Sequence, residues 1–121
     1  DVHAMHDPTE GGLATGLLEL AQAADVGLIV DQAAIPVLPE TAAFCEALDL
    51  DPLGLIASGA LLLAVAPDDV DTIQAALELE DIATACIGRV VAQERGVVIR
   101  SGDGERPLPR FERDEIARLF E

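Results

Sequence analysis

Near the start of the chain lies the stretch His3-Ala-Met-His-Asp-Pro-Thr-Glu-Gly-Gly-Leu13, which combines a strand end, a turn with two glycines and a helix start. Residues 2–5 predict the strand. The predicted helix runs to about Ala24 and has apolar residues at helical spacing, namely Leu13, Leu17, Leu20, Ala21 and Ala24. A turn of this kind directs free backbone N–H groups at an anion. It is therefore the first candidate for function.

Two interpretations of this turn stay open. In the first, Asp7 is the N-cap, Pro8 the first helical residue and Glu10 the third, a capping box that needs no ligand. That arrangement leaves Gly11 and Gly12 unexplained, because a glycine in the first helical turn costs about 1 kcal/mol relative to alanine. In the second, a phosphate or a neighbouring backbone comes close and requires the missing side chains. The turn has no lysine, which separates it from a P-loop.

A divalent metal would reconcile a phosphate site with so acidic a chain, because Mg²⁺ screens phosphate charge. Asp7 or Glu10 is the candidate ligand. His3 and His6 do not suggest a transition-metal pair, since side chains three apart on a strand point to opposite faces.

Further along, strands and helices alternate. Strands are predicted at residues 28–31, 60–65, 84–91 and 97–100, helices starting at Pro39 and after Pro67, and an amphipathic segment at 114–120. Ser101-Gly-Asp-Gly104 has the composition of a hairpin turn. Amphipathic helices that each lay one face on a sheet predict layered α/β packing, and the hairpin makes a mixed sheet the better expectation. Ser58-Gly59, before the most apolar strand, is a second candidate site or simply a helix stop.

Composition limits the classes of function. The chain has 121 residues, a formal charge of −16 and 2% aromatic residues, so it fits one domain with an aliphatic core. Its first basic residue is Arg89, and few aromatic side chains are present to stack on bases, so we expect no nucleic-acid binding. No apolar run is long enough for a membrane span; the densest, residues 60–66, is typical of a buried strand. Cys45 and Cys86 are expected to be buried thiols of a cytoplasmic protein. The abrupt start at Asp1 suggests a fragment of a longer protein.

At these residues the chain resembles the C-terminal domain of the AIR synthase (PurM-like) superfamily, closest to HypE-like AIR synthase-related proteins. The most specific match is His3 to Ala14, similar to a D-P-T-x-G-G-L motif. Matches follow in family order at residues 25–31, 34–37, 48–53 and 87–90. HypE itself ends in a cysteine, whereas residues 113–121 of this chain contain none. This difference favours the HypE-like group, and we do not predict cyanide-ligand synthesis.

The resemblance implies an α+β fold, an α/β/α layered domain with a mixed β-sheet. It also implies an N-terminal domain that dimerises and holds most of the ATP and Mg²⁺ ligands. Members use ATP to phosphorylate an amide-like or other oxygen of a small-molecule or protein substrate, and the C-terminal domain closes the cleft. The nucleotide-binding candidates are Asp7, Thr9, Gly11, Gly12, Ser58 and Gly59, with Asp7 also the metal candidate. The isolated domain is not expected to be active.

The alternative is a non-catalytic domain of the hydrogenase-maturation type that keeps the fold, uses no ATP and binds a basic protein partner through its acidic face. The enzyme hypothesis predicts that Gly12→Val weakens Mg-ATP binding without unfolding the domain, whereas the alternative predicts salt-sensitive association and no nucleotide dependence.

Overall fold

A computed structural model describes residues 2–6, 8, 11–55, 60–102 and 104–120. Its elements in chain order are β1 (Val2–His6), α1 (Gly12–Ala24), β2 (Gly27–Asp31), α2 (Pro39–Leu48), β3 (Leu62–Val65), α3 (Val70–Leu79), β4 (Gly88–Val91), β5 (Val97–Ser101) and β6 (Gly104–Pro107). Two of the short 3₁₀ helices matter below: η2 (Pro52–Gly54) and η5 (Glu115–Phe120). The strand and the helix predicted at the start of the chain are confirmed; most of the turn between them lies outside the described residues.

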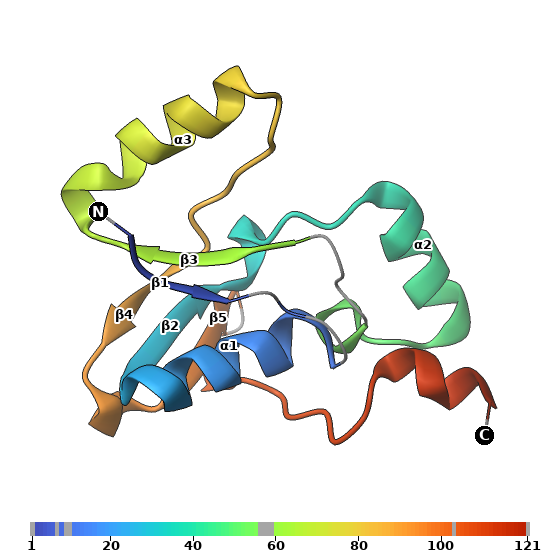
Figure 1. Cartoon of the computed structure of the whole chain (residues 1–121). Coiled ribbons are helices and arrows are strands. Elements are labelled where there is room, and N and C mark those ends of the chain that lie inside the picture. The colour runs from blue at the N-terminus through green and yellow to red at the C-terminus, as the bar shows by residue number, and fades with distance from the viewer. Residues whose placement is uncertain (1, 7, 9–10, 56–59, 103, 121) are drawn as a thin grey trace.

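Four strands form a mixed sheet in the order β4-β2-β5-β6. β2 and β5 run parallel, whereas β2–β4 and β5–β6 are antiparallel. The β5–β6 hairpin closes where Ser101 pairs with Gly104, as its turn residues predict. The layered α/β fold with a mixed sheet is therefore confirmed (Figure 1).

The core lies between α1 and one face of this sheet. Helix α1 contributes small and medium aliphatic side chains, which pack on alternate residues of the central strand β2 and on β5. The buried cluster consists of Ala14, Leu17, Ala21, Leu28, Val30, Leu53, Ile99 and Leu108. Strand β2 is buried at its first four residues, as expected for a central strand covered on both faces.

Strands β1 and β3 form a separate two-stranded antiparallel ribbon. The prediction of a buried strand over residues 60–65 is wrong in two respects: the strand begins at Leu62, and Leu61 is 53% exposed. The reason is that β1 is the only described strand that pairs with β3. β3 is therefore less covered than a strand in the middle of a larger sheet.

Two further predictions need correction. The strand expected over 84–91 begins at Gly88, because β4 pairs with β2 only over the four residues opposite Gly27–Val30. Cys45 is buried in α2 but Cys86 is exposed, so only one of the two thiols is a core residue; both are free. Within the described ranges, no helix is both long and apolar enough to cross a bilayer.

Candidate functional site

The two candidate segments of the sequence leave the same end of the β1–β3 ribbon. His6, the last residue of β1, pairs with Leu62, the first residue of β3. The segment after His6 leads to α1, and the segment before Leu62 comes from η2. Asp7, Thr9, Ser58 and Gly59 themselves lie outside the described residues. The described residues that flank them, His6 and Leu62, are adjacent.

Gly12 joins the same two segments on the other side. It has a positive φ of 67°, and a Cβ on it would lie 2.6 Å from the carbonyl oxygen of Leu53 and 2.8 Å from the amide nitrogen of Leu55. The missing side chain thus accommodates the backbone of η2 and the residue after it. Of the alternatives left open by the sequence, a neighbouring backbone explains Gly12.

Gly11 is the N-cap of α1, with φ 81° and ψ 0°, and no side chain of its own to cap the helix. The capping-box interpretation is therefore wrong for α1: the helix begins at Gly12, and Pro8 precedes it. Instead, the Gly11 N–H donates a buried hydrogen bond of 2.8 Å to Oδ2 of Asp114, 103 residues away. α1 has no acidic residue in its first turn, so this carboxylate supplies the negative charge that a helix N-terminus favours.

The neighbouring acid, Glu115, makes an equivalent contact with the second segment. Its Oε2 accepts a hydrogen bond of 2.8 Å from the backbone N–H of Asp51, just before η2. Oε2 also accepts from Nη1 of Arg118 at 3.0 Å. Sequence reasoning missed both acids. Adjacent acids at the start of an amphipathic segment were visible, but no local pattern identifies backbone partners so far away in the chain.

Thr15 adds a polar group beneath the Gly11 turn. Its hydroxyl oxygen is buried and has no hydrogen-bond partner among the described residues, and its Cβ lies against Gly11. A buried hydroxyl without a partner is rare in folded proteins. Thr84, outside the candidate segments, has a buried hydroxyl in the same state.

The described residues offer no ready-made metal site: among them no group of three or more His, Cys, Asp or Glu side chains is arranged to hold an ion. Both oxygens of Asp114 accept hydrogen bonds from backbone N–H groups. Oε2 of Glu115 accepts from a backbone N–H group and from Arg118. Burial raises the pKa of the nearby Cys45 thiol, and the negative charges of Asp51 and Glu115 raise it further. Cys45 is therefore a protonated thiol at neutral pH, unsuited to metal binding.

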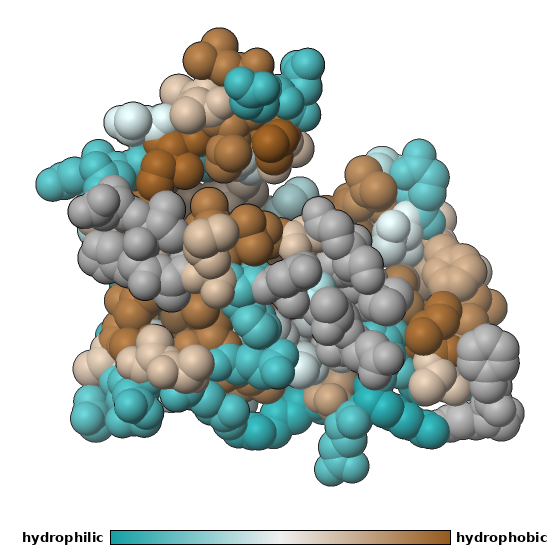
Figure 2. Space-filling model, in the orientation of Figure 1, coloured by the Kyte–Doolittle hydropathy of each residue, from teal (hydrophilic) through white to brown (hydrophobic). Residues whose placement is uncertain are grey.

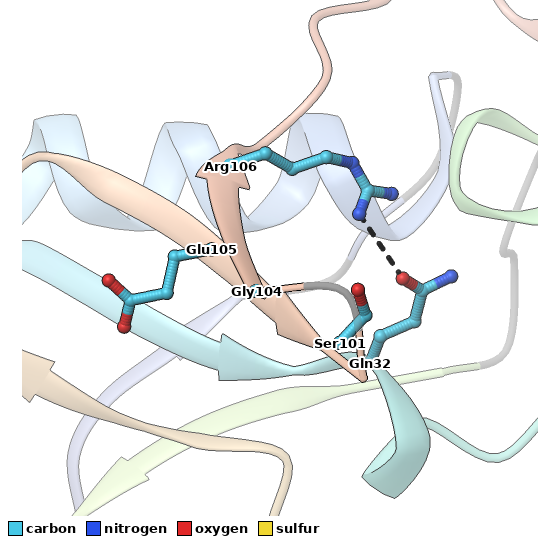
Figure 3. Close-up of a pocket in the computed structure, with 5 residues that line it drawn as sticks. All are labelled: Gln32, Ser101, Gly104, Glu105 and Arg106. Atoms are coloured by element: carbon cyan, nitrogen blue, oxygen red, sulfur yellow. Dashed lines mark hydrogen bonds between the residues drawn. The ribbon is translucent and has the colours of Figure 1, made fainter.

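A polar pocket lies on other elements, lined by Gln32, Ser101, Gly104, Glu105 and Arg106. In Figure 3, Arg106 and Gln32 point toward each other and Glu105 points away from them. Arg106 Nη1 donates to Gln32 Oε1 at 3.4 Å, and Glu105 instead faces Arg100 across the hairpin at 3.2 Å. The pocket contains none of the candidate site residues.

Exposed apolar side chains gather over α2 and α3 on the face shown in Figure 2. At α2 they include Leu38, Phe44 and Leu48, which are 69%, 43% and 41% exposed. The acidic residues Glu40, Glu46 and Asp49 of the same region are also exposed. This α2 face combines apolar and acidic character.

Comparison with known proteins matches the chain to one family. The model of "AIR synthase related protein, C-terminal domain" matches residues 1–101. Carbamoyl dehydratase HypE of Rhizobium leguminosarum bv. viciae is 38% identical over 122 residues, covering 98% of this chain and 35% of the relative. The chain thus spans about a third of the length of this relative.

Solved structures agree with the sequence match. Escherichia coli HypE has a TM-score of 0.84 at 33% identity, over 98% of this chain and 37% of that one. A structure of the hydrogenase maturation protein HypE in complex with ATP has a TM-score of 0.81 at 33% identity, over 93% and 36% of the two chains. A HypE–HypF complex has a TM-score of 0.77 at 27% identity, over 91% and 37%.

Proposed function

The chain belongs to the AIR synthase related protein family, whose C-terminal domain it matches over residues 1–101. We therefore propose that it is the C-terminal domain of an ATP-dependent enzyme of the HypE type. In this proposal it closes the nucleotide cleft against an N-terminal domain, in a cytoplasmic protein that forms a homodimer. The intact enzyme phosphorylates an amide-like or other oxygen of its substrate.

The observation that carries the proposal is the meeting of the two candidate segments. His6 pairs with Leu62 where β1 ends and β3 begins, and Gly12 contacts the backbone of Leu53 where α1 and η2 begin, so described residues on both sides of each segment are in contact. A related HypE with the same fold has been solved with ATP. The unpartnered Thr15 hydroxyl at the same turn also supports a polar ligand here.

Our proposal gives the candidate residues two roles. The Gly11 N–H already donates to Asp114, and Gly12 packs on the η2 backbone, so these two glycines shape the turn. Contact with phosphate then falls to Asp7, Thr9, Ser58 and Gly59. Asp7 is the proposed ligand of the Mg²⁺ that accompanies the nucleotide.

The described residues fit the nucleotide better than they fit a metal held by this domain alone. The turn has a buried hydroxyl without a partner, whereas no described cluster of acids is arranged around an ion. When bound, ATP supplies the γ-phosphoryl group that activates the substrate oxygen. Our proposal therefore leaves most of the Mg²⁺ ligands to the N-terminal domain.

The test is calorimetric titration of Mg-ATP into the full-length protein and its variants Asp7→Asn, Thr9→Ala and Ser58→Ala. Asp7→Asn should raise the Kd about tenfold or more, because it removes a charged ligand. Matched controls are available on α3, where Asp71→Asn and Thr72→Ala change exposed residues of the same types. No binding by the wild type, or equal losses in the α3 controls, would reject the proposal.

A second candidate function is a non-catalytic domain that binds a protein partner. It is favoured by the charge of −16 and by the apolar and acidic α2 face. HypE has been solved in complex with HypF, so a related protein does form a heteromeric assembly. This candidate predicts association that weakens steeply with salt, is reduced by Phe44→Asp, and does not respond to Mg-ATP.

A further inference from the structure

The segment that follows the sheet lies beyond the residues that the family model matches, although HypE relatives cover nearly the whole chain. The family match ends at residue 101, whereas the chain continues through β6 into residues 108–120, here called the C-terminal strap. The strap starts at the buried Leu108, whose N–H donates to Val97 O at 3.0 Å, and runs below α1 toward α2 (Figure 1). It therefore passes both candidate segments.

The strap's two consecutive acids bind one candidate segment each. Asp114 accepts from Gly11 N–H and Glu115 from Asp51 N–H, both at 2.8 Å, and each acid is only 7% exposed. Asp114 also accepts from Ile116 N–H through its other oxygen, at 3.0 Å. These are short, charge-assisted hydrogen bonds of the stronger kind. Together they tie the start of α1 to the start of η2.

Two further contacts hold the strap in place. Arg118 donates through Nη1 to Glu115 and to the backbone oxygen of Asp49, at 3.0 and 2.9 Å. The ring of Phe111 lies against Gly54 in η2, where a Cβ would come within 2.6 Å of it. The strap is thus fixed to the loop between α2 and η2 as well as to α1.

We propose that Asp114 and Glu115 are positioning residues of the nucleotide site: they hold Gly11, the N-cap of α1, and Asp51, the residue before η2, at the separation that Mg-ATP requires. The inference rests on the proposed function and extends it, since neither acid belongs to the part of the chain that the family model matches. The acids act through backbone groups. A misplacement of about 1 Å in a site that positions reacting groups can lower the reaction rate as much as a hundredfold.

The experiment compares alanine with isosteric amide variants in the full-length protein. Asp114→Ala and Glu115→Ala remove the acceptor, and each should raise the Kd for Mg-ATP about tenfold. Glu115→Gln keeps an amide oxygen in place of Oε2, the oxygen that accepts from Asp51 and Arg118, and should stay within about threefold of wild type. Asp114→Asn keeps only one of the two acceptors that Gly11 and Ile116 use, and its Kd should lie between those of wild type and Asp114→Ala. Glu112→Ala, an exposed acid of the same strap, is the matched control and should change nothing.

A second readout does not depend on nucleotide. Hydrogen exchange at the amides of Gly11 and Asp51 should speed up in Asp114→Ala and Glu115→Ala respectively, and exchange at Asp51 should remain slow in Glu115→Gln. If an alanine variant fails to fold, its amide partner and the other acid's pair still test the proposal through these amides and the Kd.

The outcomes separate the two proposals. No Mg-ATP binding by the wild type overturns the proposed function and this inference with it. Binding by the wild type with unchanged Kd in both alanine variants overturns the inference alone. Tighter binding by Asp114→Ala and Asp114→Asn would mean that the carboxylate competes with phosphate, and would also overturn a positioning role.

Discussion

The backbone of Gly12 lies directly against that of Leu53, so that a Cβ on Gly12 would come within 2.6 Å of the Leu53 carbonyl oxygen. The contact joins the first turn of α1 to η2. Because the obstacle is backbone, it cannot move aside as the tip of a flexible side chain would. Gly12→Val is therefore not a clean probe of ligand binding, contrary to the expectation from sequence.

Gly12→Ala should destabilise the fold more than a positive φ alone explains. Gly96 provides the matched control, because its φ of 71° is close to the 67° of Gly12 but nothing lies within 4 Å of its would-be Cβ. We expect a loss of about 1–3 kcal/mol for Gly96→Ala from backbone strain. Gly12→Ala should lose about 1–3 kcal/mol more, from overpacking. Urea unfolding measures both; equal losses would contradict the contact.

Much of the fold was predictable because its signals are local. Two glycines after Asp-Pro-Thr-Glu placed the turn before α1, Pro39 placed the start of α2, and Ser101-Gly-Asp-Gly104 placed the hairpin. These residues restrict the backbone wherever they occur, so their effect is visible without the rest of the chain.

What could not be predicted depends on distant partners. The strand expected at 84–91 is shorter because β2 offers β4 only four residues, and the Asp114–Gly11 hydrogen bond joins the two ends of the chain. The sequence indicated that something must approach Gly11 and Gly12. It did not distinguish a phosphate from the backbone of η2, since both require a missing side chain.

Gly54→Ala should loosen the C-terminal strap without breaking the sheet. Its Cβ would displace the ring of Phe111, which packs against the edge of the core. The cost should be about 1–3 kcal/mol, as for other overpacked contacts. Trypsin should then cut after the exposed Arg110 several times faster than in wild type. Gly102→Ala, with open space around it, is the control, and an unchanged cutting rate in Gly54→Ala would contradict the prediction.

The two thiols should differ in reactivity. Cys86 is exposed, whereas Cys45 is 2% exposed and its pKa is raised by burial and then by the charges of Asp51 and Glu115. In native buffer one equivalent of an alkylating reagent should therefore be incorporated, at Cys86, with the second entering only in denaturant. Peptide mass mapping with and without urea tests this assignment. Cys86→Ser should abolish native labelling, and rapid native labelling of Cys45 would contradict its burial.

The raised pKa of Cys45 also predicts how stability depends on pH. The fold favours the protonated thiol, so this group's contribution is complete below the unfolded-state pKa of about 8.5 and is lost as the pH rises through the higher folded-state value. The chain has no Lys and no Tyr to titrate in that range, so few other groups obscure the effect. Above a pH of about 8.5, the Tm of the wild type should fall more steeply with rising pH than that of Cys45→Ala. Cys86→Ala should follow the wild type, and parallel curves for wild type and Cys45→Ala would show that the Cys45 thiol does not contribute.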